Sequence, residues 1–111
     1  MFVTDPIGII GEEEAAKMLE AKGFRIKEHN WRMGHLEVDL IAENKKEIVF
    51  VEVKARPSGR MGDGLHAIDT QKKKRLLYAA QHYLSSHPGT RARFDAVEIT
   101  SSGLRHIPNA F

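Results

Sequence analysis

Two apolar segments separated by a short polar stretch constrain the fold of this chain most. Residues 36–42 and 48–55 are rich in Val, Ile, Leu and Phe, and the polar residues 44–47 lie between them. This pattern predicts two antiparallel strands joined by a hairpin turn. A turn of that length pairs Glu43 with Ile48 and so sets the register of the whole hairpin.

The predicted register gathers acidic side chains on one face. Continued along both strands, it places Asp39 opposite Glu52 and Glu37 opposite Lys54, whereas a slip of one residue would separate the acids. Carboxylates directly across two strands lie about 5 Å apart and repel, so a cation is expected between them. Mg²⁺ or Mn²⁺ suits oxygen ligands from Asp39, Glu52 and the carbonyl of Val53. Lys54 would hold the attacking water or a phosphate.

An alternative interpretation gives these residues no chemistry. Charged side chains are common on the open face of an antiparallel sheet, and Glu37 and Lys54 would then form an ordinary cross-strand ion pair. Both strands are apolar on both faces, however, which argues against simple one-sided edge strands.

The remaining segments predict a single α/β domain. The order is helix, three strands, helix and two strands, which indicates a mixed sheet flanked by two helices. The first helix ends at Gly23, a residue that suits the left-handed C-terminal position. The predicted bounds are 11–22 and 70–86 for the helices, and 24–31, 36–42, 48–55, 93–100 and 104–107 for the strands.

Glu12 lies at helical spacing with Ala15, Ala16 and Leu19. It therefore heads the inward-facing stripe of the first helix and could reach the acidic centre. Alternatively, Glu12 only complements the helix dipole, as its neighbours Glu13 and Glu14 would.

A basic run opens the second helix, ahead of an apolar stripe. Lys72, Lys73, Lys74 and Arg75 would oppose the helix dipole unless a polyanion binds there, so we expect a phosphate-binding end. Lys72 should point toward the sheet, whereas Lys74 and Arg75 fan outward. The alternative is a solvated charged helix start. The predicted stripe consists of Leu76, Leu77, Ala80, Tyr83 and Leu84.

Other features carry weaker signals. The six histidines lack zinc spacing and cysteine partners, which indicates surface or packing roles. Residues 57–64 predict a flap, and Arg56 and Arg60 could touch a backbone phosphate. Trp31 and Tyr78 could stack on bases, but we interpret both as core or interface residues.

Composition bounds the function only loosely. The chain has 111 residues, 41% hydrophobic and 29% charged, which argues against disorder, and no run reaches the length of a membrane span. It has no cysteine, and its first residues lack the pattern of a signal peptide, so we expect a cytoplasmic protein. A net charge of +2 is weak evidence for nucleic-acid binding, so the positions of the charged residues are more informative than their sum.

An acid on one strand, followed by Glu52-Val53-Lys54 on the next, is similar to the metal-binding core of the PD-(D/E)xK nuclease-like superfamily. More narrowly, the chain resembles the YraN family of small, uncharacterised bacterial endonuclease-like proteins. The matching stretches are Gly11-Glu12 with Ala15 and Ala16, Gly23-Phe24, Asn30-Trp31-Arg32, residues 37–42, residues 49–56, Lys72, Arg93-Phe94-Asp95 and Asn109-Ala110-Phe111. One departure is Leu36 before Glu37, where many relatives have glycine.

The resemblance implies a restriction-endonuclease-like α-β-β-β-α-β core. It implies Asp39 and Glu52 as metal ligands, Lys54 as the catalytic lysine, and Glu37 and Glu12 as accessory acids. The leading hypothesis is thus a Mg²⁺-dependent nuclease acting on nucleic acid, DNA before RNA, with a homodimer as an option. Alternatives are a non-catalytic nucleic-acid-binding module of repair or recombination, and a structural or protein-interaction domain.

Overall fold

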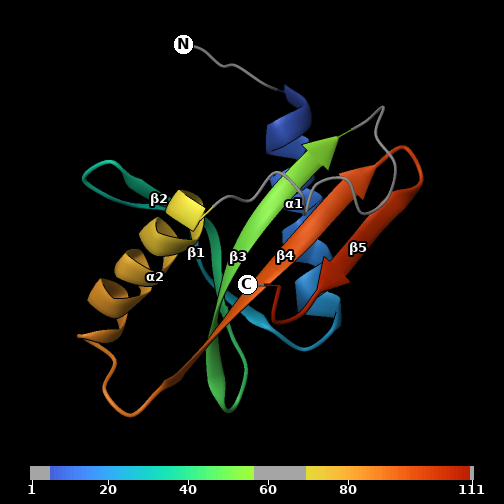
Figure 1. Cartoon of the computed structure of the whole chain (residues 1–111). Helices are drawn as coiled ribbons and strands as arrows, with labels where there is room; N and C mark the ends of the chain where they lie inside the picture. The colour runs from blue at the N-terminus through green and yellow to red at the C-terminus, as the bar shows by residue number, and fades with distance from the viewer. Residues whose placement is uncertain (1–5, 57–69, 111) are drawn as a thin grey trace.

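The chain forms one five-stranded sheet with a helix on each face (Figure 1). The structure is a computed structural model that describes residues 6–56 and 70–110. The elements are α1 (Pro6–Ala21), β1 (Arg25–Met33), β2 (Leu36–Glu43), β3 (Glu47–Arg56), α2 (Thr70–Leu84), β4 (Arg91–Thr100) and β5 (Gly103–Ile107). This is the predicted order, and none of the described helices is long and apolar enough to cross a membrane.

The strands lie side by side in sequence order. Every neighbouring pair is antiparallel except β3 and β4, which are parallel because α2 connects them across one face of the sheet. Phe50 and Ile48 pack against α2, whereas Val49 and Val51 pack against α1 on the opposite face. The alternation predicted for residues 48–53 is therefore confirmed.

The hairpin between β2 and β3 has the predicted register. Glu43 pairs with Ile48 and Ile41 with Phe50, and the turn is closed by the side chain of Asn44, which accepts the N–H groups of Lys46 and Glu47. The ladder covers only residues 40–43 and 48–51. Beyond it, the two strands no longer pair regularly, and this opening creates the site described below.

Strict alternation fails on β2 at the same point. Val38 and Leu40, two residues apart, would share a face in a regular strand, but Val38 packs with Ile41 in the cluster beneath α2, and Leu40 packs beneath α1. The break coincides with the end of the ladder at Leu40, where β2 leaves β3 and twists on its own.

The first helix starts earlier than predicted. It begins at Pro6, a residue that suits the first helical position because it has no N–H to satisfy. Glu12, Glu13 and Glu14 therefore lie beyond the first turn, and the expected dipole stabilisation of these acids is wrong. The end is as predicted: Gly23 has φ of 98°, and the amide of Phe24 donates to the carbonyl of Leu19.

Helix α2 packs one side against the sheet and leaves the other exposed. Its buried residues are Leu76, Ala79, Ala80 and Tyr83, so the predicted stripe is largely confirmed. Leu77 is an exception, because 51% of it is exposed. It follows Leu76 by 100° around the helix and so falls outside the buried arc.

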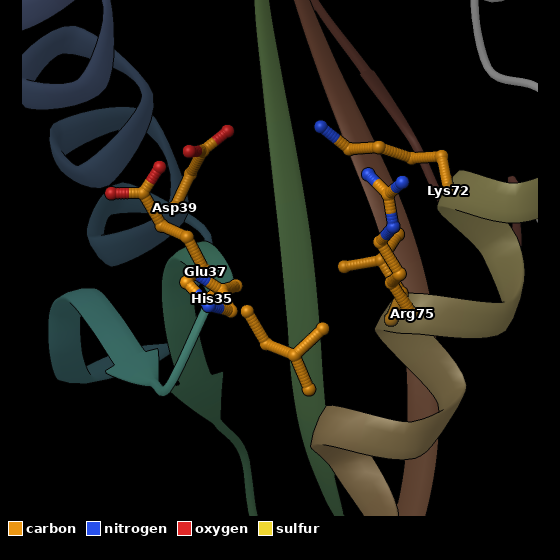
Figure 2. Close-up of a pocket in the computed structure, with 7 residues that line it drawn as sticks. His35, Glu37, Asp39, Lys72 and Arg75 are labelled. Carbon is orange, nitrogen blue, oxygen red and sulfur yellow. The ribbon is translucent and has the colours of Figure 1, made fainter.

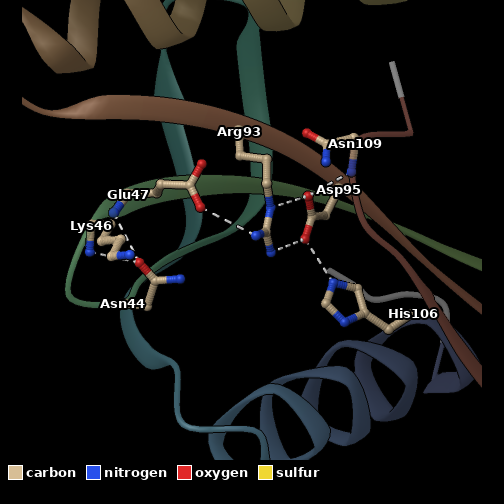
Figure 3. A network of polar contacts seen from close by, with 7 residues as sticks. All are labelled: Asn44, Lys46, Glu47, Arg93, Asp95, His106 and Asn109. Carbon is tan, nitrogen blue, oxygen red and sulfur yellow. Dashed lines mark hydrogen bonds and ion pairs between the residues drawn. The ribbon is translucent and has the colours of Figure 1, made fainter.

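A polar network ties the C-terminal segment to the sheet (Figure 3). The Asp95 carboxylate on β4 is fully buried and accepts two hydrogen bonds from Arg93, at 2.9 and 2.7 Å. It also lies 2.7 Å from Nε2 of His106 and accepts the amide of Asn109 at 3.1 Å. Arg93 in turn contacts Glu47 at 3.2 Å. The matched segments Arg93-Phe94-Asp95 and Asn109-Ala110 thus meet in one network.

Candidate metal and phosphate site

The site begins where β2 and β3 diverge. There the N–H of Val53 donates to the carboxylate of Asp39 at 2.8 Å, so a side chain replaces the strand-to-strand backbone bond. Direct pairing of Asp39 with Glu52 is not part of the ladder, which ends one residue earlier. The bond instead places the Asp39 carboxylate beside the backbone that follows Glu52, and the two acids still act on one another.

Glu52 is the buried acid of the site. Only 4% of it is exposed, and its Oε1 atom lies 2.8 Å from Nζ of Lys72 and 3.5 Å from Nζ of Lys54. Lys72 thus points toward the sheet as predicted, because α2 packs over this part of β2 and β3. One buried carboxylate is held by two lysines from different elements.

A cavity of about 190 Å³ opens between β2 and α2. Figure 2 shows Glu37 and Asp39 on one side of it, with Lys72 and Arg75 reaching across from the helix. Its lining residues are His35, Leu36, Glu37, Asp39, Lys72, Arg75 and Leu76. Pockets for drug-sized molecules are larger, about 300–1,000 Å³, so this cavity suits a small ionic group.

The electrostatics of Asp39 distinguish it from an ordinary surface acid. Burial and the nearby charge of Glu52 raise the pKa of Asp39 to about 7, although the N–H of Val53 and the ammonium of Lys72 oppose the shift. Burial lowers the pKa of Lys72, but its hydrogen bond to Glu52 and the charge of that carboxylate outweigh burial and raise it. Asp39 is thus a half-buried acid whose negative charge is incompletely balanced.

Glu12 belongs to the same electrostatic field. It lies on α1, half-buried, and its side chain hydrogen-bonds Asn30. Burial raises the pKa of Glu12, the bond to Asn30 lowers it, and repulsion from Glu37 raises it further. The prediction that Glu12 faces the acidic centre is therefore supported, because its charge acts on both Glu37 and Asp39.

Glu37 does not pair with Lys54. It lies 3.0 Å from Arg32 on the antiparallel neighbour β1, and 41% of its side chain is exposed. Lys54 contacts Glu52 instead, two residues before it on the same strand. The cross-strand ion pair of the alternative interpretation is wrong because β2 and β3 have already separated at this level.

Comparison with known proteins places the chain in a family. Residues 11–99 match the profile of the uncharacterised protein family UPF0102. A UPF0102 protein of Myxococcus xanthus is 38% identical over 94% of this chain and 87% of its own length. The chain belongs to this family. A second UPF0102 protein, from Chlorobium phaeobacteroides, is 35% identical over 99% of this chain and 97% of its own.

The UPF0102 resemblance extends beyond these two members. A relative from Nitrosococcus oceani is 42% identical over 81% of this chain and 75% of its own length. All three matches cover most of both chains.

The donor set decides which cation would fit. No group of three His, Cys, Asp or Glu side chains is arranged for a metal ion within residues 11–54 and 70–110. Two carboxylates, Asp39 and Glu52, do act on one another, and the chain has no cysteine to offer a thiolate ligand. Oxygen donors of this kind suit Mg²⁺ or Mn²⁺, and Lys72 is the cation that balances them in this state.

The other predicted phosphate-binding residues divide into groups. Arg75 lines the cavity together with Lys72, whereas Lys73 lines a separate apolar cavity of about 170 Å³ with Leu77. Lys74 is exposed on the outer side of α2. Arg60 and residues 57–64 lie outside the described residues, and so does the side chain of Arg56.

Glu98 is a residue that the sequence reasoning missed. It lies on β4, is only 1% exposed, and pairs in register with Lys54 on β3. Alternation from Phe94, which packs beneath α2, places Glu98 on the face that carries Glu52. An acid between Val97 and Ile99 was visible as an anomaly in an apolar strand, and in the structure it adds a buried carboxylate to this face of the sheet.

The unbalanced charge of Asp39 predicts that its removal stabilises the fold. The pKa of Asp39 is about 7 in the folded state and about 4 in the unfolded state. Between these two pH values the folded state holds a proton that the unfolded state has lost, so the free energy of unfolding falls as pH rises from about 4 to 7. Asp39→Asn keeps an acceptor for the Val53 N–H and removes the charge. We expect Asp39→Asn to be about 2–4 kcal/mol more stable than wild type at pH 8, measured by urea unfolding in EDTA.

The matched control is Glu37→Gln. Its side chain is largely solvated, so we expect its free energy of unfolding to stay within about 0.5 kcal/mol of wild type. An Asp39→Asn variant that is no more stable than wild type at pH 8 would show that the carboxylate is fully compensated in the fold.

Proposed function

We propose that this UPF0102 protein is a metal-dependent phosphodiesterase that cleaves nucleic acid. The observation that carries the proposal is the half-buried carboxylate of Asp39, which acts on the buried Glu52 and lines an open cavity together with Lys72, the ion-pair partner of Glu52. Groups with strongly shifted pKa values in a cleft concentrate at functional sites. A purely structural acid would be paired on all sides, as Asp95 is.

Asp39 and Glu52 would hold the divalent ion. When bound, the ion would activate a water for attack and neutralise charge on the phosphate. The Val53 N–H fixes one oxygen of Asp39, which orients the carboxylate before any ligand arrives. Buried and held by Lys54, Glu52 keeps a defined position as well. The fold therefore supplies two oriented oxygen donors.

The cations supply the other half of the chemistry. Lys72, which balances Glu52 in this state, would turn to the phosphate once an ion takes over that balance. Lys54 would orient the water, and Arg75, at the wall of the cavity, would bind a phosphate next to the one being cleaved. Glu12 and Glu37 would add negative charge around the ion without touching the phosphate.

The test is a cleavage panel with wild-type protein. Single-stranded, duplex and branched DNA, and RNA, are each incubated with Mg²⁺, Mn²⁺ or EDTA, and products are separated on denaturing gels. We expect cleavage with metal and none with EDTA. If no substrate is cut with either metal, catalysis is refuted, and binding that weakens steeply with salt would then favour the non-catalytic binding module.

A further inference from the structure

The outer face of α2 combines charge and an exposed ring. The helix has four cationic residues, Lys72 to Arg75, and no Asp or Glu along its 15 positions. Its buried side packs on the sheet through Leu76, Ala79, Ala80 and Tyr83, so the opposite side faces solvent. The exposed cations at the start of this helix attract an anionic chain.

Tyr78 is the unexpected member of this face. It was predicted to be a core or interface residue, but 62% of it is exposed, and Tyr83 is the tyrosine that enters the core. Among the described residues, Tyr78 is the most exposed of the large hydrophobic side chains. Its ring is therefore available to a partner.

The ring lies beside Arg75, one of the residues that line the cavity. Tyr78 follows Lys74 by four positions and Arg75 by three, which makes all three surface neighbours on the helix. Arg75 also lines the cavity beside Asp39 and Lys72. At 1.5 Å per residue, Tyr78 lies about 9 Å along the helix axis from Lys72, a span of about three stacked nucleotides at 3.4 Å each.

We propose that the exposed face of α2 binds an unpaired nucleic-acid strand, with one base stacked on Tyr78 and flanking phosphates on Lys74 and Arg75. This inference rests on the proposed phosphodiesterase site, into which Arg75 would direct the strand. A duplex would need only the cations, because its bases are already stacked inside the double helix and its surface presents phosphates. A solvent-exposed ring gains energy only from a base that is free to stack.

The experiment compares strand forms and ring chemistry in EDTA, so that nothing is cleaved. Fluorescence anisotropy measures binding of labelled 15-nucleotide DNA and RNA strands and of the matching DNA duplex. We expect Tyr78→Ala to weaken single-strand binding about 5- to 100-fold and duplex binding less than twofold. Tyr78→Phe keeps the ring and should bind as wild type does. Leu77→Ala, equally a loss of an exposed apolar side chain, should have no effect.

Three outcomes overturn the inference: equal losses on single strand and duplex, no loss for Tyr78→Ala, or an equal loss for Tyr78→Phe. Capture of an acidic peptide in place of the labelled strand would overturn it as well. The proposed catalysis fails separately, when the cleavage panel is negative although Tyr78 still governs single-strand binding. Conversely, if wild type and Tyr78→Ala cleaved all substrates equally well, the proposed catalysis would be supported and the proposed stacking role of Tyr78 would be refuted.

Discussion

Glu52→Gln is expected to abolish metal-dependent cleavage while leaving the fold intact. Glu52 on β3 acts directly on Asp39 of β2, the other proposed ligand, and glutamine keeps its volume but not its charge. Loss of a charged ligand removes several kcal/mol of electrostatic stabilisation, which corresponds to about a thousandfold in rate. Cleavage rates with Mg²⁺ and Mn²⁺, and metal affinity by calorimetry, both measure the effect.

Stability separates this loss from unfolding. The variant loses ion pairs with Lys72 and Lys54, but it also removes the repulsion on Asp39, so the two effects oppose each other. We expect the free energy of unfolding to change by no more than about 1 kcal/mol.

Glu43→Gln is the matched control. It removes the same charge from β2 near the hairpin turn, where Glu43 pairs with Arg25 and Lys27, and it should cut as wild type does. Cleavage by Glu52→Gln within tenfold of wild type would exclude Glu52 from the reaction.

The hairpin explains why part of the site was predictable. Its register depends on local signals, the four-residue polar turn and the period of two in β3, and these place Ile41 opposite Phe50. Lys72 was also predictable, since its spacing from Leu76 and Ala80 sets its direction on α2. Both inferences needed only neighbours along the chain.

The details that matter chemically depend on tertiary contacts. The ladder stops at Leu40 because β2 twists away beneath α2. The N–H of Val53 therefore donates to the carboxylate of Asp39 and not to a backbone carbonyl. No spacing rule indicates where a ladder ends. Glu37 turns to Arg32 for the same reason, and Glu98 joins the acidic face only through the parallel pairing of β3 with β4.

Asp95, which is fully buried, and Asp39, which is half-buried, differ in the partners that surround their carboxylates. Asp95 is surrounded by donors: burial raises its pKa, but the bonds from His106, Arg93 and the Asn109 amide outweigh burial and lower it. Asp39 has one backbone donor in the described structure, and its pKa rises. The first carboxylate stabilises the fold as an anion. The second destabilises the fold as an anion, and carboxylates with such raised pKa values concentrate at functional sites.

Asp95→Asn is expected to destabilise the protein by about 3–5 kcal/mol, because it removes the fully buried carboxylate that is the main partner of the half-buried guanidinium of Arg93. For a domain of this size, the melting temperature should fall roughly 15–25 °C. Circular dichroism measures the transition, and hydrogen exchange should show faster exchange of the Asn109 amide, whose acceptor is altered. Glu47→Gln removes only the outer, half-exposed partner of Arg93 and should cost less than about 1 kcal/mol. A loss below 1 kcal/mol for Asp95→Asn would show that the network is not a stabilising one.

The same pair of residues predicts the shape of the pH profile. Because the pKa of Asp95 is lowered, its stabilisation is present above about pH 4 and is lost as pH falls through its folded value. Asp39 acts in the opposite direction and removes stability as pH rises from about 4 to 7. We therefore expect two changes in a plot of unfolding free energy against pH from 2.5 to 8. Asp95→Asn should lose the decrease in stability at acidic pH, and Asp39→Asn should lose the decrease in stability as pH rises from about 4 to 7. If both variants kept the wild-type profile, the two carboxylates would not differ in the way that separates a structural from a functional acid.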